Sequence, residues 1–177
     1  MNLTLTPIQK TNLKFGSIIG IASFLLMLIE YSVFRNRTVS AGVIEGNGTL
    51  LLLAVGISLG IKHRRRTEPN TLLTFRQAMI TGLAIALWTA LIYSLFSYSY
   101  VVFVNPQYVD EMLLRETYKL PQTATTAETV GARLIAEMTY RPMFQLFGKF
   151  LGSLFFGLVI SSICSLVFTR KRKTQAA

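Results

Sequence analysis

Two charged residues interrupt otherwise apolar sequence and are the first candidates for chemistry. Glu30 is the single charge within residues 15–34, and Lys149 is the single charge within residues 143–168. A charge left unpaired in hydrocarbon is costly, so intramembrane ions pair with one another or serve a function. At about 1.5 Å per residue, Glu30 lies about 6 Å and Lys149 about 9 Å from the helix ends that face the same side. We therefore predict that they pair across the first and fourth helices as a structural clasp.

Other roles for these two charges stay open. Lys149 could instead extend its ammonium group to the membrane surface. The charges could also belong to a polar cavity in the outer leaflet, which would suit a small transporter or channel subunit. That cavity would be bounded by Glu30, Tyr93, Ser97 and Lys149. An enzyme acting on lipid, with Glu30 or Glu45 as acid or base, is a third hypothesis, although carboxylates alone rarely suffice without an oriented partner.

The remaining residues offer little catalytic chemistry. The chain has one cysteine, Cys164, and one histidine, His63, so neither an intrachain disulfide nor a Cys/His zinc site can form. It lacks the GxxxxGK[ST] phosphate loop, the G-x-S-x-G elbow and the HExxH zinc helix. No histidine can activate the serines of the last apolar segment, so we expect them to bond to backbone carbonyls: Ser161, Ser162 and Ser165. The sequence predicts no enzyme, no cofactor and no metal.

Four apolar segments must position these residues. The chain of 177 residues is 51% hydrophobic and 15% charged, against about 25% charged in an average protein. Its mean hydropathy is +0.47. A soluble domain this short could not bury so much apolar surface, because small domains leave a large fraction of their surface in water. About 20 apolar residues cross a bilayer as a helix, and four segments approach or exceed this length: 15–34, 43–61, 75–104 and 143–168. We predict one all-α domain over residues 1–177, a four-helix transmembrane bundle.

The first segment also has a secretory-signal interpretation. Val39-Ser40-Ala41 resembles a cleavage site. However, the apolar run is longer than a usual signal core, and Arg35 and Arg37 separate it from that site. We expect an uncleaved helix. The second segment is the weakest of the four, because Glu45, Asn47 and two glycines interrupt its start.

Residues 105–141 form the one sizeable hydrophilic part. Apolar residues from Tyr108 to Leu120 fall on one helical stripe, and Pro121 would end that helix. Thr125-x-x-Glu128 is a capping-box pattern that would begin a second helix. The same pattern, Thr74-x-x-Gln77, would begin the third apolar helix. We predict two short amphipathic helices that cap the bundle between spans three and four.

Basic residues predict the orientation, because lysine and arginine near span ends resist translocation. With the N-terminus inside, eleven of them lie on the cytoplasmic side and six on the outer connections. The main groups are the loop 62–66 and the tail 170–173. We expect a multi-pass protein of the bacterial cytoplasmic (inner) membrane, with both termini cytoplasmic and the 105–141 loop outside. The net charge of +10 lies beside apolar runs, which favours contact of the basic loop and tail with anionic lipid over nucleic acid.

Small residues recur at four-residue spacing in every span. Each such pair forms a groove where another helix backbone can approach closely, which replaces the hydrophobic drive that lipid removes. We predict helix packing at seven glycines: Gly16, Gly20, Gly56, Gly60, Gly82, Gly148 and Gly152. The stripes fit intrachain packing and a homo-oligomer equally.

Several short runs resemble a known family. They are Asn105-Pro106-Gln107-Tyr108 before Asp110-Glu111, the run 75–82, the run 141–144 and the run 152–158. They resemble an uncharacterised family of four-span bacterial membrane proteins, domain of unknown function 4199, mainly from Bacteroidetes-type bacteria. The resemblance covers most of the chain and implies a four-helix inner-membrane fold, but no activity, substrate or catalytic residue. The outer loop is richer in Thr and Ala than is typical of that family.

The leading hypothesis is a small non-enzymatic membrane protein. It would be an accessory or structural subunit that packs in the lipid bilayer with a second copy or a membrane partner. The small-residue stripes without a catalytic set favour this hypothesis over the transporter subunit with its site at Glu30 and Lys149.

Overall fold

The computed structural model describes residues 6–33, 43–67, 73–118 and 125–169. The described residues are almost entirely helical and contain no strand. The order is α1 (Pro7–Val33), α2 (Val43–Thr67), α3 (Phe75–Ser99), η1 (Tyr100–Val104), α4 (Tyr108–Tyr118), α5 (Thr126–Tyr140) and α6 (Pro142–Thr169). The predicted all-α class is confirmed. The cleavage-like sequence at 39–41, Pro121 and the basic tail 170–173 lie outside the described residues.

Four helices are long and apolar enough to cross a membrane. They are Pro7–Ser32, Ile44–Thr67, Phe75–Val104 and Pro142–Thr169. The helices extend beyond two of the predicted spans: α1 begins at Pro7 rather than at residue 15, and α2 continues past residue 61 to Thr67. Hydropathy indicates only the part of a helix that lies in hydrocarbon. Backbone hydrogen bonding continues into the polar region, so the helix is longer than its apolar segment.

Capping boxes begin two of the four long helices. At α3, the Thr74 hydroxyl accepts the Gln77 amide, and the Gln77 side chain accepts the Thr74 amide, as predicted. At α1, Thr6 and Gln9 make the same reciprocal pair, and Pro7 occupies the first helical position, where its missing N–H costs nothing. The side chain of Glu128 lies outside the described part, so the box predicted at Thr125 stays a prediction.

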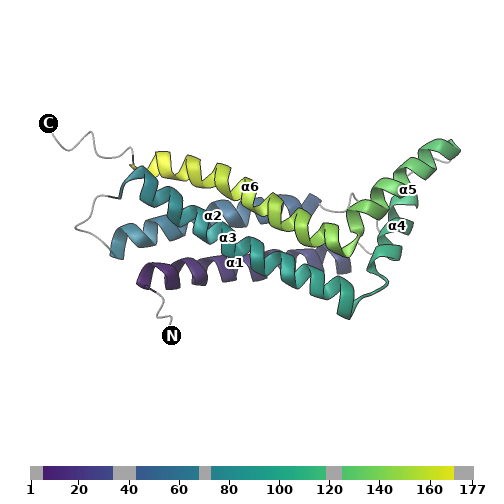
Figure 1. The fold of residues 1–177 in the computed structure, drawn as a ribbon, viewed down its shortest axis with the longest axis horizontal. Helices are drawn as coiled ribbons and strands as arrows, with labels where there is room; N and C mark the ends of the chain where they lie inside the picture. Colours follow the sequence, from purple (N-terminus) through teal and green to yellow (C-terminus); the bar gives the residue numbers. More distant parts are fainter. Residues whose placement is uncertain (1–5, 34–42, 68–72, 119–124, 170–177) are drawn as a thin grey trace.

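The four long helices run side by side, and α4 and α5 lie beyond one end of them (Figure 1). The start of α1, the end of α2, the start of α3 and the end of α6 lie at the opposite end (Figure 1). That end carries Lys10, Lys14 and the 62–66 cluster, and we call it the basic end; the other is the capped end. Helix α3 packs against α1, α2 and α6, and α2 packs against α1 and α6. Helices α1 and α6 are therefore diagonal, with α2 and α3 between them.

Close packing of small residues joins the helices. A Cβ atom on Gly82 would lie 2.8 Å from Cβ of Ser161 and 3.0 Å from Cγ2 of Ile57. One on Gly16 would lie 2.9 Å from the carbonyl oxygen of Ile85. The Thr89 hydroxyl donates to the Gly16 carbonyl at 3.2 Å, a polar link that this approach makes possible. Five of the seven predicted glycines lie in such contacts with another helix: Gly16, Gly20, Gly56, Gly60 and Gly82.

The glycine pair predicted on α6, Gly148 and Gly152, meets no other helix of the described chain, so its packing against a second copy stays a prediction. A Cβ on Gly148 would meet only Phe144 of its own helix, and one on Gly152 would meet nothing within 4 Å in the described part of the chain. The packing glycine of α6 is Gly157, which faces Ala86. The four-residue spacing could not show that Gly157 rather than Gly148 and Gly152 contacts α3, because spacing does not show which side of α6 faces that helix.

Candidate functional site

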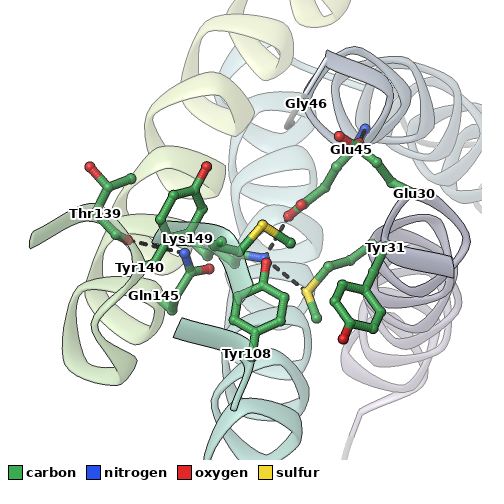
Figure 2. Close-up of a pocket in the computed structure, with 11 residues that line it drawn as sticks. Glu30, Tyr31, Glu45, Gly46, Tyr108, Thr139, Tyr140, Gln145 and Lys149 are labelled. Atoms are coloured by element: carbon green, nitrogen blue, oxygen red, sulfur yellow. Dashed lines mark hydrogen bonds and ion pairs between the residues drawn. The ribbon is translucent and has the colours of Figure 1, made fainter. Parts of the chain in front are cut away.

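A polar cavity of about 250 Å³ lies at the capped end. It is enclosed by the last turns of α1, the first turn of α2, the start of α6 and the cap helices. Its lining is Met27, Glu30, Tyr31, Glu45, Gly46, Tyr108, Met112, Thr139, Tyr140, Gln145 and Lys149 (Figure 2). One water needs only about 15 Å³ of such space, so the cavity is large enough for a small ligand.

An ion pair between α6 and α2 crosses this cavity. Lys149 Nζ lies 2.6 Å from Glu45 Oε1, and their side chains are 13% and 17% exposed. Lys149 Nζ also contacts Met27 Sδ at 3.0 Å and lies 4.9 Å from the ring centroid of Tyr93. Each of the other three long helices thus supplies one contact to Lys149 of α6.

The predicted ion pair between Glu30 and Lys149 is wrong, because the acidic partner of Lys149 is a different residue. Lys149 pairs with Glu45, whereas Glu30 Oε2 accepts the backbone N–H of Glu45 at 2.5 Å. Helical rise gave both residues the correct depth, and both line the cavity. The partner was wrong because α1 and α6 are diagonal in the bundle, while α2 adjoins both of them.

Of the other two predicted site residues, one joins this centre and one does not. The Tyr93 hydroxyl donates to Glu45 Oε1, and its ring lies under Lys149. Ser97 is fully buried but lines neither this cavity nor the neighbouring groove between α2, α3 and α6. Its hydroxyl has no hydrogen-bond partner among the described residues.

Four tyrosines surround the cavity side of the cap. Tyr108 stacks edge-on or tilted against Tyr31, Tyr100 and Tyr140, with ring centroids 5.5, 6.2 and 6.4 Å apart. The π-helical turn η1 places Tyr100 and ends in the Asn105 amide, which donates to the Tyr100 carbonyl at 2.8 Å. π-Helical turns are frequent at functional sites.

The hydroxyl of Tyr108 has no hydrogen-bond partner in the described structure, although the residue is only 4% exposed. Figure 2 shows its hydroxyl end directed toward the middle of the lining residues. Burial, followed by the charge of Glu45, raises the pKa of Tyr108 above its ordinary value, so the group stays a neutral phenol. The hydroxyl oxygen is not itself among the buried unpaired atoms of the described residues, and because it belongs to the cavity lining, a ligand there can bond to it.

A second hydrogen-bonded group ties the cap to α1. The Tyr31 hydroxyl donates to the Glu111 carboxylate. Asn105 Nδ2 donates to the Tyr31 oxygen at 2.8 Å and lies 3.5 Å from Glu111 Oε2. This group fixes α4 against the bundle and so positions Tyr108.

An apolar groove continues from the cavity along the bundle. It encloses about 340 Å³ between α2, α3 and α6, and its lining is Gly46, Asn47, Thr49, Leu50, Leu53, Tyr93, Lys149, Gly152, Ser153 and Phe156. The groove and the cavity share Gly46 and Lys149. Added Cβ atoms at Gly46 and Gly152 would touch nothing within 4 Å among the described residues, so these glycines keep the groove open.

Comparison with known proteins identifies the family. The family described as protein of unknown function (DUF4199) matches residues 14–170. The chain belongs to the DUF4199 family. This confirms the family that the short runs of sequence resemble, while the bacterial source stays a prediction. Searches of the curated proteins and of the solved structures found no match.

This member of DUF4199 has the four long apolar helices of a multi-pass membrane protein. Among the residues that the structure describes, no group of three His, Cys, Asp or Glu could hold a metal ion. Ser162 and Ser165 donate to the carbonyls four residues earlier, as predicted, whereas the buried Ser161 hydroxyl has no partner in the described part. The ionisable side chains that line the site are Glu30, Glu45, Lys149 and the tyrosines Tyr31, Tyr108 and Tyr140.

Sequence reasoning missed four contributors: Tyr31, Glu45 as the partner of Lys149, Tyr108 and Glu111. Glu45 carried a usable signal, since it is the acid in the first turn of α2, where the helix N-terminus favours negative charge. Tyr108 lay within the run that indicated the family, but nothing in its spacing showed that it would meet α1 and α5.

Proposed function

We propose that this protein is a small non-enzymatic membrane protein, an accessory subunit whose cavity at the capped end binds a small cationic group. The observation that carries this proposal is the composition of the cavity. The Glu45 carboxylate lines the cavity, and only one of its two oxygens, Oε1, is bonded by described side chains, those of Lys149 and Tyr93. Tyrosine rings line the same space, and aromatic faces attract cations.

The cavity also retains unused hydrogen-bonding capacity. Glu45 accepts bonds from Lys149 and Tyr93 through Oε1, and its Oε2 accepts none from the described residues. The Tyr108 hydroxyl belongs to the same lining and can accept a further hydrogen bond. An ammonium or amine donor between these two oxygens would satisfy both.

Both acids of the lipid-enzyme hypothesis line the cavity, but their contacts favour binding over catalysis. Glu30 holds the amide of Glu45, and Glu45 holds Lys149 and Tyr93. A general acid or base must exchange a proton with a substrate. Carboxylates fixed by such contacts serve better as constant negative charge.

The packing below the cavity favours a binding site over a pathway through one chain. A core in which Ile57, Ile61 and Ile85 are fully buried separates this cavity from a further cavity of about 270 Å³ at the basic end, between the start of α1 and the end of α2. A transporter or channel would therefore need several copies. Helix α6 offers a face for such packing, since 22% of its apolar stretch is buried in the described chain, against 44% for α3. A second copy or a membrane partner would bind there.

The proposal includes an orientation. Seven of the eleven lysines and arginines in the described residues lie at the end opposite the cap. Since basic segments stay inside, we infer that the cap and its cavity face the extracytoplasmic side of the inner membrane, with both termini cytoplasmic. The exposed Lys62, Arg65 and Arg66 would then contact anionic lipid of the inner leaflet.

Thermal unfolding of the detergent-purified protein with ethanolamine tests the proposal. A ligand at ten times its dissociation constant stabilises the folded state by about 1.4 kcal/mol, so ethanolamine should raise the unfolding midpoint beyond sodium chloride of equal ionic strength. Tyr108→Phe removes only a hydroxyl without a partner, so it should keep the basal midpoint and weaken the ethanolamine response. Equal midpoints in ethanolamine and sodium chloride would overturn the proposal.

A further inference from the structure

The groove beside the cavity points to the source of the cationic group. We propose that the two spaces together bind one aminophospholipid of the surrounding membrane, with its headgroup in the cavity and an acyl chain in the groove. This inference rests on the proposed function and adds the class of ligand. It is carried by the adjacency of the cavity and the groove, which share Gly46 and Lys149 in their linings.

The groove has the form and the lining that an acyl chain needs. Leu50, Leu53 and Phe156 supply apolar contact, and Gly46 and Gly152 leave room that a side chain would fill. Gly46 and Phe156 are exposed on the described chain. The groove is therefore open on the side of the bundle, where a lipid can enter without leaving the bilayer.

The position of Lys149 matches the order of groups in such a lipid. In an aminophospholipid, the phosphate lies between the amine and the acyl chains. Lys149 lines both spaces, so it lies between the polar cavity and the apolar groove. Its ammonium has three donors, of which Met27 Sδ and Glu45 Oε1 take two. The third can bond to a phosphate oxygen, which attracts it by charge as well.

The cavity then takes the amine beyond the phosphate. Glu45 Oε2 can accept its N–H, and Tyr31 and Tyr140 line the same space, where an aromatic face attracts a cation. The Tyr108 hydroxyl lies within the same lining and can form a hydrogen bond with either the phosphate or the amine of the headgroup. An anionic headgroup such as that of phosphatidylglycerol would bring its phosphate to Lys149 but no cation to Glu45 Oε2. We therefore expect selectivity for the zwitterionic lipid.

Native mass spectrometry of the detergent-purified protein with added phosphatidylethanolamine or phosphatidylglycerol tests this inference. The wild-type protein should retain phosphatidylethanolamine with about tenfold higher affinity, the effect of one charge-assisted hydrogen bond. Gly152→Leu fills the groove and should lose this binding. Gly131→Leu is the matched control, because Gly131 is equally uncrowded in the described chain and lies on α5 outside the groove; it should bind as wild type.

The ethanolamine measurement separates the two proposals. If Gly152→Leu loses the lipid but keeps the ethanolamine response and the basal unfolding midpoint, the groove holds the acyl chain as inferred. If phosphatidylglycerol binds equally well, or Gly152→Leu binds phosphatidylethanolamine as wild type does, the lipid inference is overturned. An ethanolamine response that persists in that case leaves the cation site standing, and its absence removes both proposals.

Discussion

The two ends of the four-helix bundle are held together by different interactions. Toward the basic end, aliphatic side chains such as Ile57 and Ile85 are fully buried and small residues let the helices touch. At the capped end, an ion pair, a tyrosine cluster and hydrogen bonds connect helices that leave two open spaces between them. In lipid, helix association depends on close packing and polar contacts rather than on hydrophobic drive. The difference indicates that the aliphatic core on the basic side of the bundle stabilises the fold, which allows the capped end to keep space for a ligand.

Removal of Lys149 should have the largest effect, because it breaks the polar connection of the capped end. Lys149→Met leaves Glu45 as a buried charge without its cation, and breaking a buried pair in this way costs about 3–5 kcal/mol. Thermal unfolding in detergent should show a large decrease in the midpoint.

The double variant Lys149→Met/Glu45→Gln provides the control for charge. Replacement of both members of a buried pair is often nearly neutral, so it should recover much of the loss. If it is as unstable as Lys149→Met, then the packing of the lysine side chain, not its charge, holds this end together.

A matched pair of glycine substitutions should give the next largest effect and compares the two ends directly. Gly16→Leu would push a side chain into Trp88 and the backbone of α3 at the tightly packed end. Such overpacking costs about 1–3 kcal/mol. Gly152→Leu enters open space and should leave the unfolding midpoint unchanged. Equal losses for the two variants would contradict the assignment of stability to the basic end.

The smallest effect concerns an exposed pair in the cap. Arg141 donates to Glu137 at 2.8 Å, and this bond and charge lower the pKa of Glu137 below its ordinary value. A lowered pKa in the folded state means that the pair contributes stability above the unfolded pKa. The contribution is lost as pH falls through the lowered value. Carboxyl NMR titration should find the Glu137 pKa depressed in the wild type and restored toward normal in Arg141→Gln; equal values would show that the pair does not persist in solution.

Sequence periodicity and composition predicted the helices well and the contacts between them poorly. The spans near 75–104 and 143–168 and the capping box at Thr74 follow from local patterns, and the structure has them. The partner of Lys149 and the packing glycine of α6 depend on how each helix is rotated and which helices are adjacent. Small residues and charges occur on more than one face of these helices, so their spacing could not show which of them face a neighbouring helix.

By itself, the sequence determined that four stretches are apolar enough to need a non-aqueous environment, that the basic groups gather at one end, and that Glu30 and Lys149 have similar depth. Those properties depend on residue type and on the fixed rise of a helix. Only the tertiary structure decided that Lys149 pairs with Glu45, that Tyr108 faces a cavity without a partner, and that Gly46 and Gly152 border an open groove. These outcomes depend on lateral neighbours distant in sequence, and in a bundle that choice is made by the fit of all four helices at once.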